Sequence, residues 1–228
     1  MKKVLLSWLV CIVSVIPGWS ASKEQQRITD AGNVVKAVAG MPEGIPANLL
    51  EKARCVVVLP SVKKFAIGIG GSYGRGVMTC RGGADFKGPW SAPAMFALEG
   101  GNIGFQLGGQ EADFVLLIMN EDGARSVMSS KVKLGADASA AAGPVGRDST
   151  AATDVVLKTQ ILSYSRSRGL FAGVSLEGST LRNDGDANKN LYGKDYSAKQ
   201  ILQEGIVKAP ASARPLLATL SKYRLSAK

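Results

Sequence analysis

Basic side chains beside small residues are the feature of this sequence that best fits a binding chemistry. Each of the following lies next to a glycine, a serine or an expected turn: Lys63, Lys64, Arg75, Arg147, Arg166 and Arg168. Cationic groups held beside a closely approaching backbone are a common way to bind phosphate. If they converge, each adds about 1 kcal/mol of attraction to an anionic membrane, whereas scattered over a surface they contribute little.

Two of these arginines occupy the tip of an expected hairpin. The stretch ILSYSRSRGLFAGVSLEG at 161–178 has strand-like runs on either side of residues 165–169, whose composition is that of a turn. Side chains at such a bend project from the fold, and binding residues often lie there. Arg166 and Arg168 therefore have two interpretations, a clamp for an anionic group or ordinary charges on a solvated turn.

Most catalytic chemistries are excluded by the residues that the sequence lacks. The chain has no histidine, which removes imidazole acid–base catalysis and the Ser-His-Asp arrangement. A G-x-S-x-G motif at 70–74 lies between strand-like runs, whereas a nucleophile elbow needs a strand-to-helix turn and a base. We expect no catalytic residue, metal or cofactor. The disfavoured alternative is a hydrolase using carboxylates that are scattered singly: Glu99, Glu111, Asp113, Asp137, Asp148 and Glu177.

Glycine is abundant, at 27 of 228 residues, or about 12% against a usual ~7%. Most of it falls between Gly68 and Gly146, which indicates tight turns in a β-rich region. Short strands are predicted at 56–59, 65–70, 72–81, 94–98, 102–107 and 114–119, separated by Pro60 and by glycine pairs.

Helical patterns lie on both sides of these strands. Apolar residues at three- and four-residue steps predict an amphipathic helix over 23–40, which either packs on the protein's own core or meets a membrane. Further helices are predicted at 47–53, from Asp122 to Ser129, at 197–205 and at 215–223, with a polar loop at 183–190. The fold class is therefore α+β, with an antiparallel β-meander or barrel-like core of short Gly-rich strands bracketed by N-terminal and C-terminal helices.

The first 22 residues have the plan of a secretory signal peptide. Lys2 and Lys3 precede the apolar run 4–16, which is too short to span a bilayer, and small residues follow the break at 17–18. Cleavage after Ser20 or after Ser22 is compatible with the pattern, while a lipoprotein site at Cys11 is disfavoured by the preceding valine. We expect residues 1–22 to be removed and 23–228 to form one domain, periplasmic or secreted.

The charge and the cysteines of residues 23–228 fit this location. Without Lys2 and Lys3 the charge is 26 minus 18, or +8, which favours anionic lipid head groups, acidic glycans or nucleic acid. Export makes nucleic acid the least favoured, and we expect none. Cys55 and Cys80 border strand-like runs, and if these runs pair, a disulfide would add about 3 kcal/mol. Two free thiols are the alternative.

Six blocks of the sequence, taken in order, resemble the SYLF domain family. The resemblance covers residues 31–201. The blocks are PSVKK at 60–64 with IGGSYGRGV at 69–77, WSAPA at 90–94, GFQLG at 104–108, LGADA at 134–138, AGPVGR at 142–147, and SYSRS at 163–167 with GLFAG at 169–173.

The resemblance implies a lipid-binding module, with phosphoinositide and actin binding described for eukaryotic members and exported phospholipid-binding proteins among bacterial ones. It transfers no catalytic residues. We therefore expect a non-enzymatic protein of the bacterial envelope whose basic residues engage anionic phospholipid, while the helix over 23–40 or another apolar surface receives acyl chains. The alternative is a structural or protein-interaction module without lipid specificity, whose protein partner the sequence does not identify.

Overall fold

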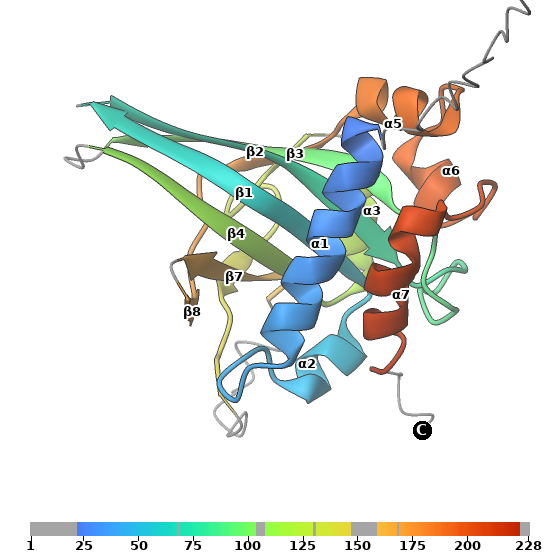
Figure 1. Ribbon diagram of the computed structural model, residues 1–228, viewed down its shortest axis with the longest axis horizontal. Coiled ribbons are helices and arrows are strands. Elements are labelled where there is room, and N and C mark those ends of the chain that lie inside the picture. Colours follow the sequence, from blue (N-terminus) through green and yellow to red (C-terminus); the bar gives the residue numbers. More distant parts are fainter. Residues whose placement is uncertain are drawn as a thin grey trace, which may run out of the picture.

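The computed structural model describes residues 22–67, 69–103, 108–129, 131–146, 159–167 and 169–223. Within these ranges, side chains are described everywhere except at 65–70 and 101–109. The expected α+β class is confirmed, because a curled, mostly antiparallel sheet is flanked by N-terminal and C-terminal helices (Figure 1). The strands are β1 (Cys55–Ile67), β2 (Ile69–Cys80), β3 (Ala94–Ile103), β4 (Gly108–Ile118), β5 (Val132–Lys133), β6 (Ala140–Ala142), β7 (Ile161–Ser167), β8 (Leu170–Gly173) and β9 (Thr180–Asn183).

The sheet follows the order β5-β9-β3-β2-β1-β4-β7-β6, and β8 pairs with β7 as the returning arm of the expected hairpin. All of these pairings are antiparallel except that of β6 with β7. Consecutive antiparallel strands β1, β2 and β3 confirm a meander. Beside them, β4 returns to pair with the other edge of β1.

The central strands are long, and the prediction of short ones was wrong. β1 continues through Pro60, and β3 continues through the glycine pair that was expected to end it. Glycine here permits close approach of two backbones. A methyl group on Gly76 would overlap the carbonyl oxygen of Val58 and lie 2.7 Å from Leu59 Cα. Glycines inside these strands thus let neighbouring strands pack closely as the sheet curls.

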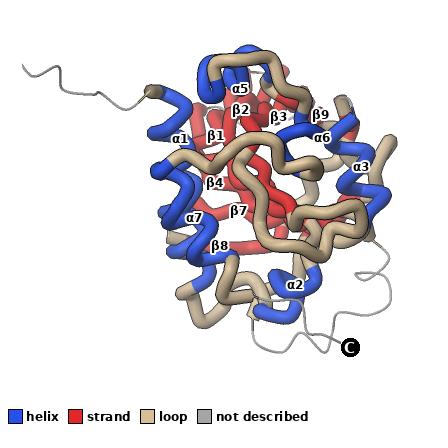
Figure 2. The backbone as a smooth tube through the Cα atoms, turned by 90° about the vertical axis from the view of Figure 1, so that its right-hand side faces the viewer, coloured by secondary structure: helices blue, strands red, loops and turns tan. Residues whose placement is uncertain are grey.

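Alternating side chains of the sheet enter two cores. Val56 and Val58 face the first, which we call the α1 face, together with apolar residues of α1 (Lys23–Ala39), α2 (Ala47–Lys52) and α7 (Arg214–Leu220). Val57 and Leu59 face the second, the α6 face, which is covered by α3 (Glu121–Ser129) and α6 (Ala198–Leu202). Figure 2 shows the strands with α1 and α7 on one side and α3 and α6 on the other.

The predicted N-terminal helix is confirmed as α1, and Ser22 and Gln25 cap it reciprocally. Its apolar stripe, which includes Ile28 and Val35, is buried against the sheet and α7. The stripe is therefore occupied by the protein's own core rather than open to acyl chains. Among the described residues, no helix combines the length and apolar character needed to span a membrane.

Two local predictions were wrong because capping side chains were misread. The expected polar loop at 183–190 overlaps α5 (Gly185–Tyr192), whose first turn is capped by Asp184 through the amide of Ala187. α3 begins one residue before Asp122, and the oxygen of Asn120 accepts from the Gly123 amide. In both cases a side-chain oxygen satisfies an amide that the helix leaves unpaired.

Cys55 and Cys80 are direct partners across β1 and β2, and the structure joins them by a disulfide. Both side chains are fully buried in the core of the α6 face. The described residues contain no group of three or more cysteines and carboxylates that could hold a metal ion.

Candidate functional site

A β-bulge in β1 decides which basic side chains share a face of the sheet. Leu59 pairs with Phe114 and Val62 with Ala112, so three steps along β1 match two along β4. The extra residue inverts the alternation beyond it, because successive side chains point to opposite faces. Leu59 and Val62 therefore both face the α6 core, and Lys63 is turned to the α1 face.

Lys63 consequently joins two side chains of β2. It pairs directly with Tyr73, and residues two apart on a strand share a face, so Arg75 lies on the same side. Val77, the next residue in this series, is in the core of the α1 face. Two of the predicted binding residues, Lys63 and Arg75, are thus brought to one surface.

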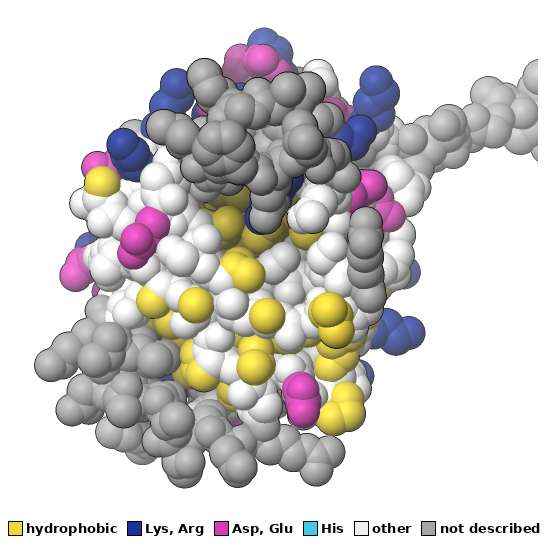
Figure 3. Space-filling view, turned by 90° about the vertical axis from the view of Figure 1, so that its left-hand side faces the viewer, with side chains coloured by type: hydrophobic (Ala, Val, Ile, Leu, Met, Phe, Trp, Pro, Cys, Tyr) yellow, Lys and Arg dark blue, Asp and Glu magenta, His cyan; other side chains and the backbone are white. Residues whose placement is uncertain are grey.

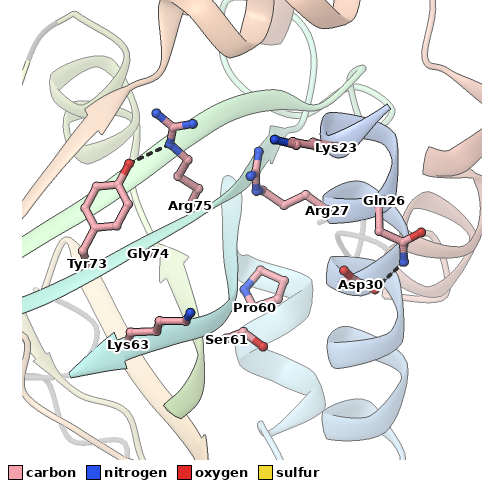
Figure 4. Close-up of a pocket in the computed structure, with 10 residues that line it drawn as sticks. All are labelled: Lys23, Gln26, Arg27, Asp30, Pro60, Ser61, Lys63, Tyr73, Gly74 and Arg75. Atoms are coloured by element: carbon pink, nitrogen blue, oxygen red, sulfur yellow. Dashed lines mark hydrogen bonds between the residues drawn. The ribbon is translucent and has the colours of Figure 1, made fainter. Parts of the chain in front are cut away.

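The N-terminal half of α1 supplies the opposite wall of a groove. Lys23 and Arg27 are one helical turn apart and extend from α1 toward β1 and β2 (Figure 4). We call this cavity, of about 670 Å³, the basic groove. Its lining residues are Lys23, Gln26, Arg27, Asp30, Pro60, Ser61, Lys63, Tyr73, Gly74 and Arg75.

Three of the four cations in the basic groove are available to a ligand. Among the described residues, Lys23, Arg27 and Lys63 form no salt bridge. Nη1 of Arg27 is buried and has no hydrogen-bond partner within the described part of the chain. An unpaired buried donor is costly, and Arg27 carries one within the described part of the chain.

Arg75, in contrast, is already held in place. Its single Nε–H donates to the hydroxyl of Tyr73 at 2.6 Å, a bond that raises the pKa of Arg75, while partial burial opposes the rise. The same nitrogen lies 3.1 Å from Oδ2 of Asp184, which makes an ion pair rather than a second hydrogen bond. Arg75 is therefore oriented, and its charge is partly neutralised before any ligand binds.

One carboxylate lines the groove beside the cations. Oδ1 of Asp30 accepts from the side-chain amide of Gln26 at 2.9 Å, one turn away on α1. Lys23, Arg27, Lys63 and Arg75 still outnumber it, and the groove keeps a net positive charge. Its chemistry is that of an anion site with acceptors and donors beside it for a polar head group.

The other predicted basic residues lie elsewhere. Lys64 points to the opposite face, with its ammonium 5.0 Å from the ring centre of Phe114. Arg166 donates from Nε and Nη2 to Oδ2 of Asp113, at 3.0 and 2.6 Å, and lines a separate cavity of about 300 Å³. Arg147 and Arg168 lie outside the described residues.

Lys23 and Arg27 line the groove but were not among the predicted binding residues. Their four-residue spacing, which places two cations on one face, was the signal that could have identified them. Lys63 was predicted as a binding residue, but the face on which it lies was not predictable, because that face depends on the bulge at Pro60 and Ser61.

Comparisons with known proteins agree on one family. A family described as "Ysc84: Las17-binding protein actin regulator" matches residues 99–223. The chain is 36% identical over 187 residues to "Protein YSC84" of Saccharomyces cerevisiae, covering 80% of this chain and 39% of that protein. It is 32% identical over 205 residues to "LAS seventeen-binding protein 3" of the same species, covering 88% and 43%.

A vertebrate relative is similar over most of the chain. "SH3 domain-containing YSC84-like protein 1" of Bos taurus is 32% identical over 212 residues, which cover 90% of this chain and 59% of that protein. The chain thus spans about two fifths of the yeast relatives and three fifths of the bovine one. The description of the family and the name of the second yeast relative refer to binding of another protein, Las17 or LAS seventeen.

Proposed function

Because the chain belongs to the Ysc84 family, whose pattern matches more than half of it, we propose that it is a non-catalytic binding module for anionic phospholipid. The phosphate of the head group enters the basic groove between α1 and the strands β1 and β2. The observation that carries the proposal is the set of three cations there, Lys23, Arg27 and Lys63, that lack a carboxylate partner among the described residues.

Each side chain of the groove has a distinct part in this proposal. Arg27 offers a planar guanidinium, a shape that suits two-point contact with phosphate oxygens. Lys23 and Lys63 are exposed ammonium groups that add charge on either wall. Arg75, fixed by Tyr73 and Asp184, supplies an oriented but partly neutralised charge.

Sedimentation with lipid vesicles tests the proposal. We expect the protein to sediment with vesicles of phosphatidylcholine that contain phosphatidylglycerol and to remain in solution with phosphatidylcholine alone. Raising the salt from about 0.1 M to 1 M shortens the screening length from about 10 Å to 3 Å, and binding should fall accordingly. Equal sedimentation with both vesicles, or binding that does not change with salt, would contradict it.

The proposed setting is the bacterial envelope, reached through a cleaved signal over residues 1–22. Nearly all of this segment lies outside the described residues, so the expectation depends on its sequence pattern. N-terminal sequencing of the protein from fractionated cells checks it. We expect a periplasmic or secreted chain that begins at Ala21 or Lys23. An unprocessed Met1 in the cytoplasmic fraction would contradict this location.

A protein partner is the second candidate function, favoured by one surface and by the names of the relatives. Leu170 of β8 is 78% exposed. The end of the molecule toward which the long strands extend carries apolar side chains near its centre (Figure 3). Native mass spectrometry of the protein isolated from its own cells separates the two candidates. A stoichiometric protein partner lost on Leu170→Asp would favour this function, and retained phospholipid would favour the first.

A further inference from the structure

Asp113 of β4 connects the bulge of β1 to the β7–β8 hairpin. Its Oδ1 accepts from the backbone amide of Ser61 at 3.0 Å, and its Oδ2 accepts both hydrogen bonds of Arg166. Ser61 has a positive φ of 54°, a conformation that non-glycine residues adopt only when surrounding contacts hold them. Asp113 supplies such a contact at the residue that shapes the bulge.

The bulge in turn places Lys63. Val58 pairs with Val77 and Lys63 with Tyr73, so five steps along β1 match four along β2. β1 therefore carries one extra residue relative to both of its neighbours. Without that residue, the strand beyond Ser61 would present its other set of side chains to each face. Lys63 would then leave the groove, and its place would be taken by a side chain of the other set.

We infer that Asp113 is a positioning residue of the basic groove, acting on the ligand through Ser61 and Lys63, and that Arg166 holds Asp113 in place. This inference rests on the proposed phospholipid binding. It also gives Arg166 a part other than direct contact with lipid, since its guanidinium is bound to Asp113 and lines the separate cavity.

Removal of Asp113 separates two explanations, because an effect of charge alone and the loss of the Ser61 contact change the affinity for anionic lipid in opposite directions. A carboxylate near a basic groove repels an incoming phosphate, so its loss should strengthen binding if charge were all that mattered. Loss of the Ser61 contact should instead weaken binding, by at most the effect of removing Lys63. That effect is about fivefold for one cation near an anionic membrane.

The experiment measures the affinity of Asp113 variants for phosphatidylglycerol vesicles. We expect Asp113→Ala to bind up to about fivefold more weakly than the unchanged protein. Asp113→Asn retains an oxygen that can accept from Ser61, and it should bind at least as well as the unchanged protein. In a Lys63→Gln background, Asp113→Ala should cause little further loss, whereas a general loss of structure would add to the loss already present.

Glu99→Ala is the matched control. Glu99 is also bound to an arginine of a neighbouring strand, Arg182 of β9, at 2.8 Å, but it does not contact the bulge. We expect this variant to lose stability as Asp113→Ala does and not to lose affinity. If Asp113→Ala binds as tightly as the unchanged protein or more tightly, the inference is wrong, although phospholipid binding itself still stands.

Hydrogen exchange of the Ser61 amide tests the inference without any ligand. Exchange should be faster in Asp113→Ala than in the unchanged protein, and near the original rate in Asp113→Asn. An unchanged exchange rate in Asp113→Ala would overturn the inference even if the vesicles are not bound. Absence of vesicle binding by the unchanged protein would instead refute the proposed function.

Discussion

Replacing Lys23, Arg27 and Lys63 together by glutamine should remove most of the attraction between the basic groove and anionic lipid. These three cations line the groove, and none has a salt-bridge partner among the described residues. Their full charge is therefore available to a phosphate. Glutamine keeps much of the length and polarity of each side chain, so the substitution changes mainly charge.

The expected loss follows from the number of free charges. At about 1 kcal/mol for each cation near an anionic surface, three cations amount to about 3 kcal/mol, or a loss of affinity on the order of a hundredfold. Arg75 should count for less than any of the three, since Asp184 lies 3.1 Å from its Nε. Arg75→Gln alone is accordingly expected to weaken binding by less than about fivefold.

Sedimentation with vesicles that contain phosphatidylglycerol measures this loss over a series of lipid concentrations. The matched control is a triple variant with glutamine at Lys36, Lys194 and Lys222, which are exposed and lie outside the groove. Both variants lower the net charge by the same amount. Binding should fall much further in the groove variant than in the control.

Equal loss in the two triple variants would refute this reasoning, because binding would then depend on net charge rather than on the groove. Near-native affinity in the groove variant would refute it as well. Thermal unfolding of both variants provides the check on folding, since the three groove residues are at the surface or partly exposed and their loss should change stability little.

Two predictions concern the scaffold that holds the groove. Gly76→Ala should lower the free energy of unfolding by about 2 kcal/mol or more, because its methyl group would overlap backbone atoms of Val58 and Leu59. In Gly71→Ala the added methyl group would have its nearest contact at an ordinary 3.6 Å, so this variant should change the free energy of unfolding little. Equal effects of the two variants in urea unfolding would contradict the close approach at Gly76. Replacing Cys55 and Cys80 by alanine should lower the free energy of unfolding by about 3.5 kcal/mol on the chain-entropy model, given their sequence separation of 25. A reductant should destabilise the unchanged protein and leave the alanine variant unaffected. If the reductant changes the stability of neither protein, the disulfide is contradicted.

The sequence predicted the fold class because periodic patterns are local. The three- and four-residue steps of Ile28, Ala31, Val35 and Val38 identified α1, and all four are buried. Strand lengths were not predictable in the same way. Glycine pairs usually mark turns, but here they lie inside β2, β3 and β4. The single glycine Gly76 lies so close to the backbone of β1 that a larger side chain does not fit. That restriction comes from tertiary packing.

The binding residues were predicted only in part for a similar reason. Lys63 and Lys64 are equivalent by composition, yet the bulge turns Lys63 to the groove and Lys64 toward Phe114. Arg166 is bound to Asp113, 53 residues earlier in the chain, a contact that no local pattern indicates. The sequence indicates that the site is basic, but which of the basic strand residues line the groove depends on the strand register.

Determination of the structure with a short-chain phosphatidylglycerol bound is the most direct test of the central claim. We expect the phosphate in the groove between α1 and the strands β1 and β2, within hydrogen-bonding distance of the Arg27 guanidinium and of Nζ of Lys63. A phosphate bound at another surface, such as the cavity beside Arg166, with the basic groove empty would contradict the account.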